Sequence, residues 1–138
     1  MRRVMAEEIF ESFHKVRPYE CDIYNHVNNA IYLNYLEFAR MEVLEKKGFQ
    51  LHKLKEEGFN LVIREIHIRY LYPAVPNDQL VIRTRLKEHT NVTATFFQEI
   101  VRLPDEKPIA RADVTWVVVN SQGRPVRIPA KLREALGF

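Results

Sequence analysis

The chain has 138 residues and a net charge of +3, a length typical of one domain. Hydrophobic residues make up 46% of it, enough to bury a core, yet no apolar run approaches the roughly 18 residues that cross a bilayer. The single cysteine excludes an internal disulfide. The basic residues are spread along the chain, so the charge is too weak an argument for nucleic-acid binding.

The first element predicted along the chain is a strand over residues 8–20, where apolar and polar residues alternate loosely. Arg17-Pro18 ends it, and a polar loop over residues 21–28 follows. Acidic residues precede any apolar stretch at the start of the chain, which argues against a signal peptide. We therefore expect a cytoplasmic protein.

A helix over residues 29–47 is the next predicted element. Asn28 or Asn29 is a natural N-cap, and Gly48 after two lysines is a C-terminal signal. Apolar residues occur on nearly every face of this helix, whereas an amphipathic surface helix has one polar face. We therefore expect other parts of the structure to enclose most of the helix.

The rest of the chain predicts a short helix over residues 50–57, ended by Gly58, and then four long strands. The strands are rich in Val, Ile, Thr, Phe and Tyr, and they span residues 61–72, 79–88, 92–103 and 109–120. Their short connections imply antiparallel pairing. Residues 129–136 predict a closing helix, with Pro129 near its first turn. This order predicts an α+β fold, in which a curved antiparallel sheet wraps around one long helix.

The run from Asp22 to Asn29 concentrates polar chemistry just ahead of the apolar helix. A carboxylate can act on water or on a carbonyl carbon, and the N–H groups of a first helical turn can hold an oxyanion. Asp22 is therefore the candidate catalytic carboxylate. His26 either takes part in acid–base chemistry or holds the loop. Asn28 and Asn29 either cap the helix or bind a carbonyl group.

Other reactive side chains fit the same site less well. Cys21 is adjacent to Asp22, but strand alternation would send its thiol to the opposite face. Glu37 and Arg40 lie three apart on the helix and are expected to pair, or to contact a second subunit. The remaining histidines show no spacing typical of metal ligands, and no glycine-rich phosphate loop is present. We expect neither a metal nor a cofactor.

Three stretches of this region resemble the signature of the hotdog-fold acyl-CoA thioesterases of the YbgC and 4-hydroxybenzoyl-CoA thioesterase type. They are Tyr19–Asp22, His26–Leu33 and Tyr35–Arg40. The string from Asp22 to Asn29 also resembles the plant acyl-ACP thioesterases. The resemblance implies a single hotdog domain over residues 1–138, which hydrolyses acyl-CoA to a free acid and CoA.

The resemblance also implies roles for individual residues. Asp22 matches the carboxylate that attacks the thioester or activates water, and the backbone N–H of Asn29 matches the group that polarises the carbonyl. Some YbgC members carry a histidine in place of Asn29. Glu37 is the reserve carboxylate, since some hotdog thioesterases carry theirs on this helix.

The resemblance also implies binding partners. The family forms dimers, edge to edge, with active sites at the subunit interface, so we expect a homodimer or a homotetramer. We expect Asn28 to contact the substrate, and Lys87 and His89, in a turn over residues 87–91, to meet the phosphates of CoA. The second choice for the phosphates is the basic C-terminal stretch with Arg124, Arg127 and Lys131.

Two other functions remain open on the sequence. One is a non-catalytic hotdog protein that binds acyl-CoA as a signal, which could lack the carboxylate. The other is a hydratase or dehydratase of the same fold. MaoC-like hydratases carry Asp-x-Asn-Pro-x-His, whereas Asp22 and His26 are four apart with no proline between them.

Overall fold

The computed structural model describes residues 2–3 and 8–138. The acidic start of the chain, which argues against a signal peptide, lies mostly outside these residues. The elements are, in chain order, β1 (Arg2–Arg3), β2 (Phe10–Lys15), the 3₁₀ helix η1 (Pro18–Glu20), α1 (Asn29–Lys46), α2 (Leu51–Glu56), β3 (Asn60–Tyr70), β4 (Gln79–His89), β5 (Thr93–Leu103), β6 (Lys107–Val119), β7 (Pro125–Val126) and α3 (Ala130–Leu136). No helix in the described part of the chain is long and apolar enough to cross a membrane.

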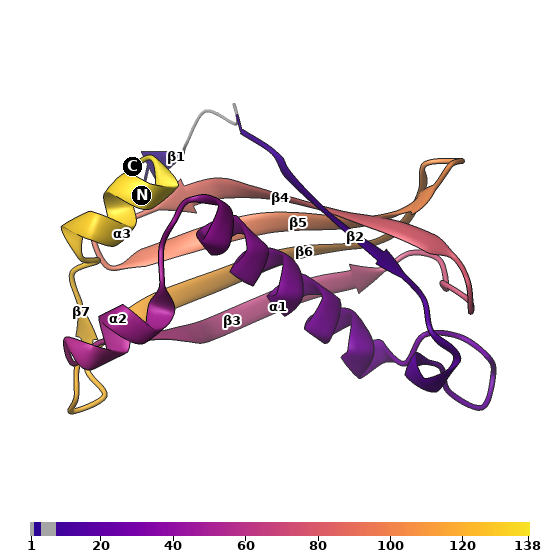
Figure 1. Cartoon of the computed structure of the whole chain (residues 1–138), viewed down its shortest axis with the longest axis horizontal. Coiled ribbons are helices and arrows are strands. Elements are labelled where there is room, and N and C mark those ends of the chain that lie inside the picture. The colour runs from indigo at the N-terminus through magenta and orange to yellow at the C-terminus, as the bar shows by residue number, and fades with distance from the viewer. Residues whose placement is uncertain (1, 4–7) are drawn as a thin grey trace.

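The strands form one antiparallel sheet in the order β1-β4-β5-β6-β3, with β2 also paired to β4 and β7 to β6. Strand β2 covers the first half of β4, from Lys15 opposite Gln79 to Phe10 opposite Thr84. Strand β3 forms the other edge of the sheet. The sheet curves around α1, which crosses its concave face (Figure 1). This arrangement confirms the hotdog fold expected from the sequence.

The predicted helices and long strands agree with the structure, apart from shifts at their ends. The first strand is shorter than expected, because the chain turns into η1 after Val16. The two-residue strands β1 and β7 were not predicted, because so short a pairing leaves no alternation in the sequence. Strand β6 begins at Lys107, since the hairpin after β5 uses fewer residues than the predicted turn.

One face of α1 packs against the sheet and forms the main core. Its buried residues are Tyr32, Tyr35, Leu36, Ala39, Val43 and Leu44. The opposite face carries two exposed apolar side chains, Phe38 at 46% and Met41 at 40%. The expected enclosure of α1 is therefore wrong for a single chain, because the sheet covers only one side of the helix.

A second cluster of buried side chains closes the far end of the sheet. It joins the C-terminal part of α1 to α2, α3 and the ends of β5 and β6, through residues such as Leu44, Leu54, Trp116 and Leu132. Figure 1 shows α2 and α3 at this end and the loop after β2 at the other. The two ends of the domain therefore differ: α2 and α3 cover one end, and the polar loop lies at the other.

Candidate active site

The loop between η1 and α1 is fixed mainly by backbone hydrogen bonds. The N–H of Asp22 donates to the carbonyl of His26 at 2.8 Å, and the N–H of Asn28 donates to the carbonyl of Glu20 at 3.0 Å. The N–H of Val27 donates to the carbonyl of Ala74, in the segment between β3 and β4, at 2.9 Å. These bonds close the loop on itself and tie it to the end of the sheet, so its side chains project from a fixed frame.

The carboxylate of Asp22 is held by one of its two oxygens. Oδ1 accepts the N–H of Tyr24 at 2.9 Å and that of His26 at 3.4 Å. No described residue donates a hydrogen bond to Oδ2, and Asp22 is exposed in the single chain. The loop therefore orients the carboxylate through Oδ1, while Oδ2 accepts no hydrogen bond from the described residues and is available to a substrate or water.

The start of α1 provides a backbone donor next to this carboxylate. Asn28 is the N-cap: its Oδ1 accepts the N–H of Ala30 at 2.8 Å, and its carbonyl accepts the N–H of Ile31 at 2.9 Å. Asn29 is the first helical residue, whose N–H an α-helix leaves without an internal acceptor. This N–H carries the positive end of the helix dipole and suits a carbonyl oxygen that gains negative charge.

A pocket of about 360 Å³ brings these groups together. Asp22, His26 and Asn29 all line it, and the opposite wall consists of Tyr32 and of residues 70–73 after β3. The hydroxyl of Tyr70 donates to the carbonyl of Asn29 at 3.1 Å, which anchors the first turn of α1 to β3. The three catalytic candidates predicted from the sequence thus share one cavity.

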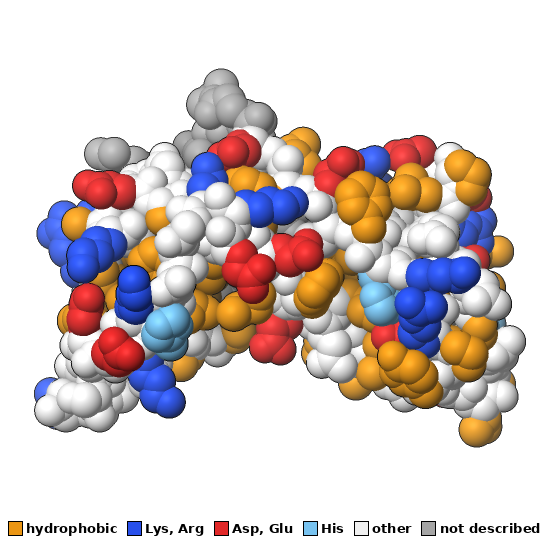
Figure 2. Space-filling view, in the orientation of Figure 1, with side chains coloured by type: hydrophobic (Ala, Val, Ile, Leu, Met, Phe, Trp, Pro, Cys, Tyr) orange, Lys and Arg blue, Asp and Glu red, His pale blue; other side chains and the backbone are white. Residues whose placement is uncertain are grey.

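The outside of this end of the molecule is rich in exposed apolar side chains. Tyr19 of η1 is 84% exposed, and Ile23 and Tyr24 of the loop are 91% and 73% exposed. Figure 2 shows hydrophobic side chains gathered at the end of the molecule where the loop lies, beside basic side chains and a histidine. A patch of this kind is typical of a surface that meets another molecule.

A buried network under the loop was not expected from the sequence. The side chain of Glu20, 11% exposed, accepts hydrogen bonds from the N–H of Arg17 at 2.8 Å and the hydroxyl of Tyr35 at 2.8 Å. It also lies 2.9 Å from Nε2 of His14. The partners come from β2, η1 and α1, so Glu20 joins three elements at the base of the loop. Tyr35 follows Glu20 by 15 residues in the sequence, and no spacing rule links the two positions.

The pKa of Glu20 reflects this network. Burial is the largest single influence and favours the protonated form, but hydrogen bonds from Arg17, His14 and Tyr35 together outweigh it and lower the pKa. For Tyr35 burial comes first, and the hydrogen bond to Glu20 adds to it, so the pKa of its hydroxyl is raised. Glu20 therefore stays ionised and Tyr35 stays a hydrogen-bond donor.

Replacing Glu20 with glutamine is expected to cost about 1–3 kcal/mol of stability at about pH 7. The lowered pKa means that the stabilisation by Glu20 is fully present above its unfolded pKa near 4.5 and is lost as the pH falls through the folded value. Urea unfolding of both proteins at about pH 7 and about pH 3 measures the difference. The two proteins should converge in acid, and a difference that stays constant with pH would contradict this role of the charge.

Lys87 and His89, expected to meet the phosphates of CoA, lie elsewhere in the structure. Both belong to β4 and not to a turn, because β4 continues to pair with β5 as far as His89 opposite Ala94. Lys87 forms an ion pair with Asp113 at 3.0 Å, and the ring of His89 stacks on Phe138 at 4.2 Å. The loop adjoins the other end of β4, about 30 Å away for an 11-residue strand.

Two other cationic side chains lie against Tyr72, which lines the pocket. The Nζ atom of Lys107 lies 4.6 Å from the centre of the Tyr72 ring, and the guanidinium of Arg102 lies 5.3 Å from it. Tyr72 lines the pocket with Asp22. Sequence reasoning missed both cations, because only the β5–β6 hairpin brings them to this end. Arg124, Arg127 and Lys131, the second choice, lie after β6, at the end with α2 and α3.

Two further expectations concern neighbouring side chains. The predicted ion pair of Glu37 with Arg40 is replaced by a hydrogen bond from Arg40 to Oε1 of Gln98 at 3.0 Å, because Arg40 points toward the sheet. Cys21 does not lie in a strand but in the loop, where it forms an isolated bridge with Val27. Burial, with the charges of Glu20 and Asp22, raises the pKa of the Cys21 thiol, which makes it a poor nucleophile.

No group of three or more metal-ligating side chains occurs in the part of the chain that the structure describes. The residues that line the pocket include a carboxylate, an imidazole and the first residue of a helix.

Residues 16–136 match the thioesterase-like superfamily. The long-chain acyl-CoA thioesterase FadM of Escherichia coli is 36% identical over 124 residues, which cover 88% of this chain and 92% of FadM. The chloroplastic acyl-acyl carrier protein thioesterase ATL2 of Arabidopsis thaliana is 35% identical over 123 residues. These span 89% of this chain but only 65% of ATL2.

A solved structure gives the same picture of the fold. The crystal structure of YbaW, a probable thioesterase from Escherichia coli, superposes with a TM-score of 0.80 at 32% sequence identity. The similarity covers 91% of this chain and 95% of YbaW.

Proposed function

The chain belongs to the thioesterase-like superfamily, and from its Asp22 pocket we propose that it hydrolyses acyl-CoA thioesters to a free acid and CoA. One observation carries the proposal: Asp22, whose Oδ2 accepts no hydrogen bond from the described residues, and Asn29, the first residue of α1, line the same cavity. A thioester carbonyl that accepts the Asn29 N–H places its carbon within reach of the carboxylate. A non-catalytic acyl-CoA binder would need the pocket but not a carboxylate with an open oxygen.

Two routes use these groups. In the first, Oδ2 attacks the carbonyl carbon, the C–S bond breaks, CoA leaves as the thiolate, and water then hydrolyses the mixed anhydride. In the second, Asp22 takes a proton from water as the water attacks. In both, the Asn29 N–H stabilises the oxyanion, and His26 can pass a proton to the leaving thiolate. Turnover in heavy-oxygen water tests the first route: when water attacks the Asp22 carbonyl carbon of the anhydride, label enters the Asp22 carboxylate, which the second route never labels.

The test of the function is a panel of acyl-CoAs assayed with a thiol reagent that reports free CoA. Turnover by the purified protein that disappears in the Asp22 variant described below supports the proposal. Binding of acyl-CoA without release of CoA would instead favour the non-catalytic alternative.

The carrier's phosphates are proposed to lie at the pocket's rim. Within one chain Lys87 and His89 are too far from Asp22, so they can serve only if a second subunit brings its β4 to the pocket. Lys107 and Arg102 adjoin Tyr72 in the same chain, and we place the phosphates there first. Asn28 contributes through the cap that holds the Asn29 N–H in place.

We further propose a homodimer through the free edge of β3. No strand among the described residues pairs with the outer side of β3, which is 11 residues long. Val62 and Ile63 on β3 are 38% and 41% exposed, and Met41 of α1, which is 40% exposed, lines the same cavity as Ile63. An unpaired edge strand of this length with exposed apolar side chains pairs readily with another strand.

Replacing Val62 with lysine is expected to shift the protein from dimer toward monomer, because a charge on an edge strand opposes edge-to-edge pairing. The matched control is Val92→Lys, which changes a valine of similar exposure, 40%, in the β4–β5 turn. Light scattering over a dilution series measures the mass. A wild-type mass near the 16.4 kDa monomer, or equal masses for the two variants, would contradict the proposed interface.

A further inference from the structure

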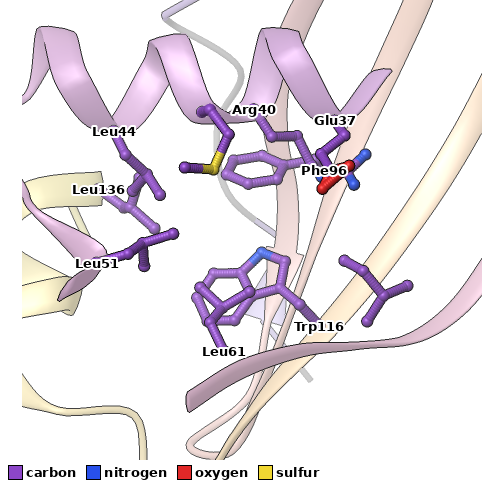
Figure 3. A pocket seen from close by; sticks show the side chains of 10 residues that line it. Glu37, Arg40, Leu44, Leu51, Leu61, Phe96, Trp116 and Leu136 are labelled. Atoms are coloured by element: carbon purple, nitrogen blue, oxygen red, sulfur yellow. The ribbon is translucent and has the colours of Figure 1, made fainter. Parts of the chain in front are cut away.

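A second cavity lies between α1 and the sheet, beyond the Asp22 pocket. Its volume is about 150 Å³, and most of its wall is apolar, from α1, α2, β3, β5 and α3. Figure 3 shows Leu44, Leu51 and Leu136 on one side of it, and Leu61 and Trp116 below. An apolar cavity of about this size holds a molecule such as benzene, so about six carbons fit.

One residue in the wall of this cavity, Trp116, carries a buried hydrogen-bond donor without an acceptor. Trp116 is 1% exposed, and its indole Nε1–H has no hydrogen-bond partner among the described residues. In Figure 3 the indole nitrogen lies on the side of the ring that faces α1, across the cavity. Buried N–H groups nearly always have a partner, and leaving one unpaired costs stability. The position of this N–H points to an acceptor that the chain itself does not supply.

The guanidinium of Arg40 supplies further donors at the same cavity. It gives one hydrogen bond to Oε1 of Gln98, which is fully buried and is itself fixed by bonds from its Nε2 to the carbonyl of Leu36 and the hydroxyl of Thr84. A guanidinium has five N–H donors, so Arg40 retains several. The nearby charge of Glu37, which also lines the cavity, balances that of Arg40 and favours a neutral ligand group over a carboxylate.

The geometry points to a subsite for an acyl chain that carries a neutral acceptor oxygen, a hydroxyl or an oxo group, far from the thioester. This inference rests on the proposed thioesterase function and names its substrate class. The hydrocarbon fills the apolar part of the cavity, and the oxygen accepts hydrogen bonds from Trp116 and Arg40. A plain hydrocarbon would leave the Trp116 N–H unpaired and is therefore the poorer ligand.

An apolar strip on β3 connects the two cavities. Ile66 and Ile68 are partly buried against the α1 core, Ile63 lines the second cavity, and Tyr70 lines the Asp22 pocket. An acyl chain held at Asn29 can follow this strip along α1. The strip is open in the single chain, where Ile63 and Tyr70 are 41% and 48% exposed.

The length of this path fixes the position of the oxygen. Arg40 follows Asn29 by 11 residues of α1, which is about 16 Å at about 1.5 Å per residue. An extended alkyl chain with bonds of about 1.5 Å and angles of about 111° advances about 1.25 Å per carbon, so it covers this distance in about 13 carbons. The favoured substrate therefore carries its oxygen at about carbon 12 to 14 of a long chain.

The kinetic experiment compares long-chain acyl-CoAs with and without a hydroxyl at about carbon 12 to 14, and with the hydroxyl moved to carbon 3 as a control for polarity. The wild type should prefer the distal hydroxyl by about five- to tenfold in kcat/KM, the effect of one hydrogen bond. Trp116→Phe keeps an aromatic ring but removes the N–H, so it should lower the preference, which then depends on Arg40 alone. A wild type without preference at any position, or a variant that keeps the full wild-type preference, would overturn the inference.

A binding measurement does not depend on turnover or on the variant's folding. Trp116 is the only tryptophan of the chain, so fluorescence excited selectively at tryptophan reports on the wall of this cavity. Titration with a distally hydroxylated fatty acid should shift the emission to longer wavelength and saturate at lower concentration than titration with the plain acid. Equal titrations for the two acids would overturn the inference even if the protein hydrolyses acyl-CoA. Loss of all thioesterase activity with an intact fluorescence difference would refute only the proposed reaction.

Discussion

Replacing Asp22 with asparagine is expected to lower kcat for acyl-CoA hydrolysis by roughly 10²- to 10⁴-fold while the fold stays intact. The amide oxygen of asparagine can still accept the N–H of Tyr24, which Oδ1 of Asp22 accepts at 2.9 Å, so the loop keeps its shape. What the change removes is the negative charge at Oδ2, the atom proposed to attack the thioester or to take a proton from water. Steady-state kinetics with urea unfolding of the same preparation measures both consequences.

The comparison variant is Glu37→Gln, which neutralises the reserve carboxylate on α1. Glu37 lines the second cavity and not the Asp22 pocket, so its loss should cost far less in kcat than the loss of Asp22. A folded Asp22→Asn protein with more than about a tenth of wild-type activity would refute the assignment. A larger loss of kcat in Glu37→Gln than in Asp22→Asn would assign the catalytic carboxylate to Glu37.

The architecture of this protein follows from its sequence pattern. Alternation and turn residues predict four long strands, and the N-cap at Asn28 and the stop at Gly48 predict the bounds of α1 within a residue. These signals are local, since each depends on residues within one element or its ends. The two-residue strands β1 and β7 depend on partners far along the chain and leave no local pattern.

The same distinction explains which parts of the site could be predicted. Asp22, His26 and Asn29 lie within one short loop, so the sequence already places them together. Glu20 meets His14 and Tyr35 only because β2 and α1 come together in the fold. Lys87 looked like a turn residue, but it sits at a bulge of β4, where pairing with β5 resumes after it. The positions of Glu20 and Lys87 therefore depend on contacts between distant parts of the chain, which local sequence patterns do not predict.

The second large effect is expected from replacing Asn29 with proline. Proline has no N–H, so this variant removes the donor proposed for the thioester oxygen and lowers kcat by roughly 10²- to 10³-fold. The helix should tolerate it: Asn29 is the first residue of α1, a position where proline is common. Asn28 before it has φ −61° and ψ 140°, the extended geometry that a residue preceding proline prefers.

The matched control for this variant is Asn29→Ala, which removes the same side chain but keeps the backbone N–H. Alanine should therefore retain most of the activity, and both variants should unfold at similar urea concentrations, because neither changes the cap between Asn28 and Ala30. The ratio of kcat for the two variants isolates the N–H from the side chain. Turnover at the wild-type level by both variants would show that another group holds the oxyanion, whereas equal losses in both would assign the effect to the asparagine side chain.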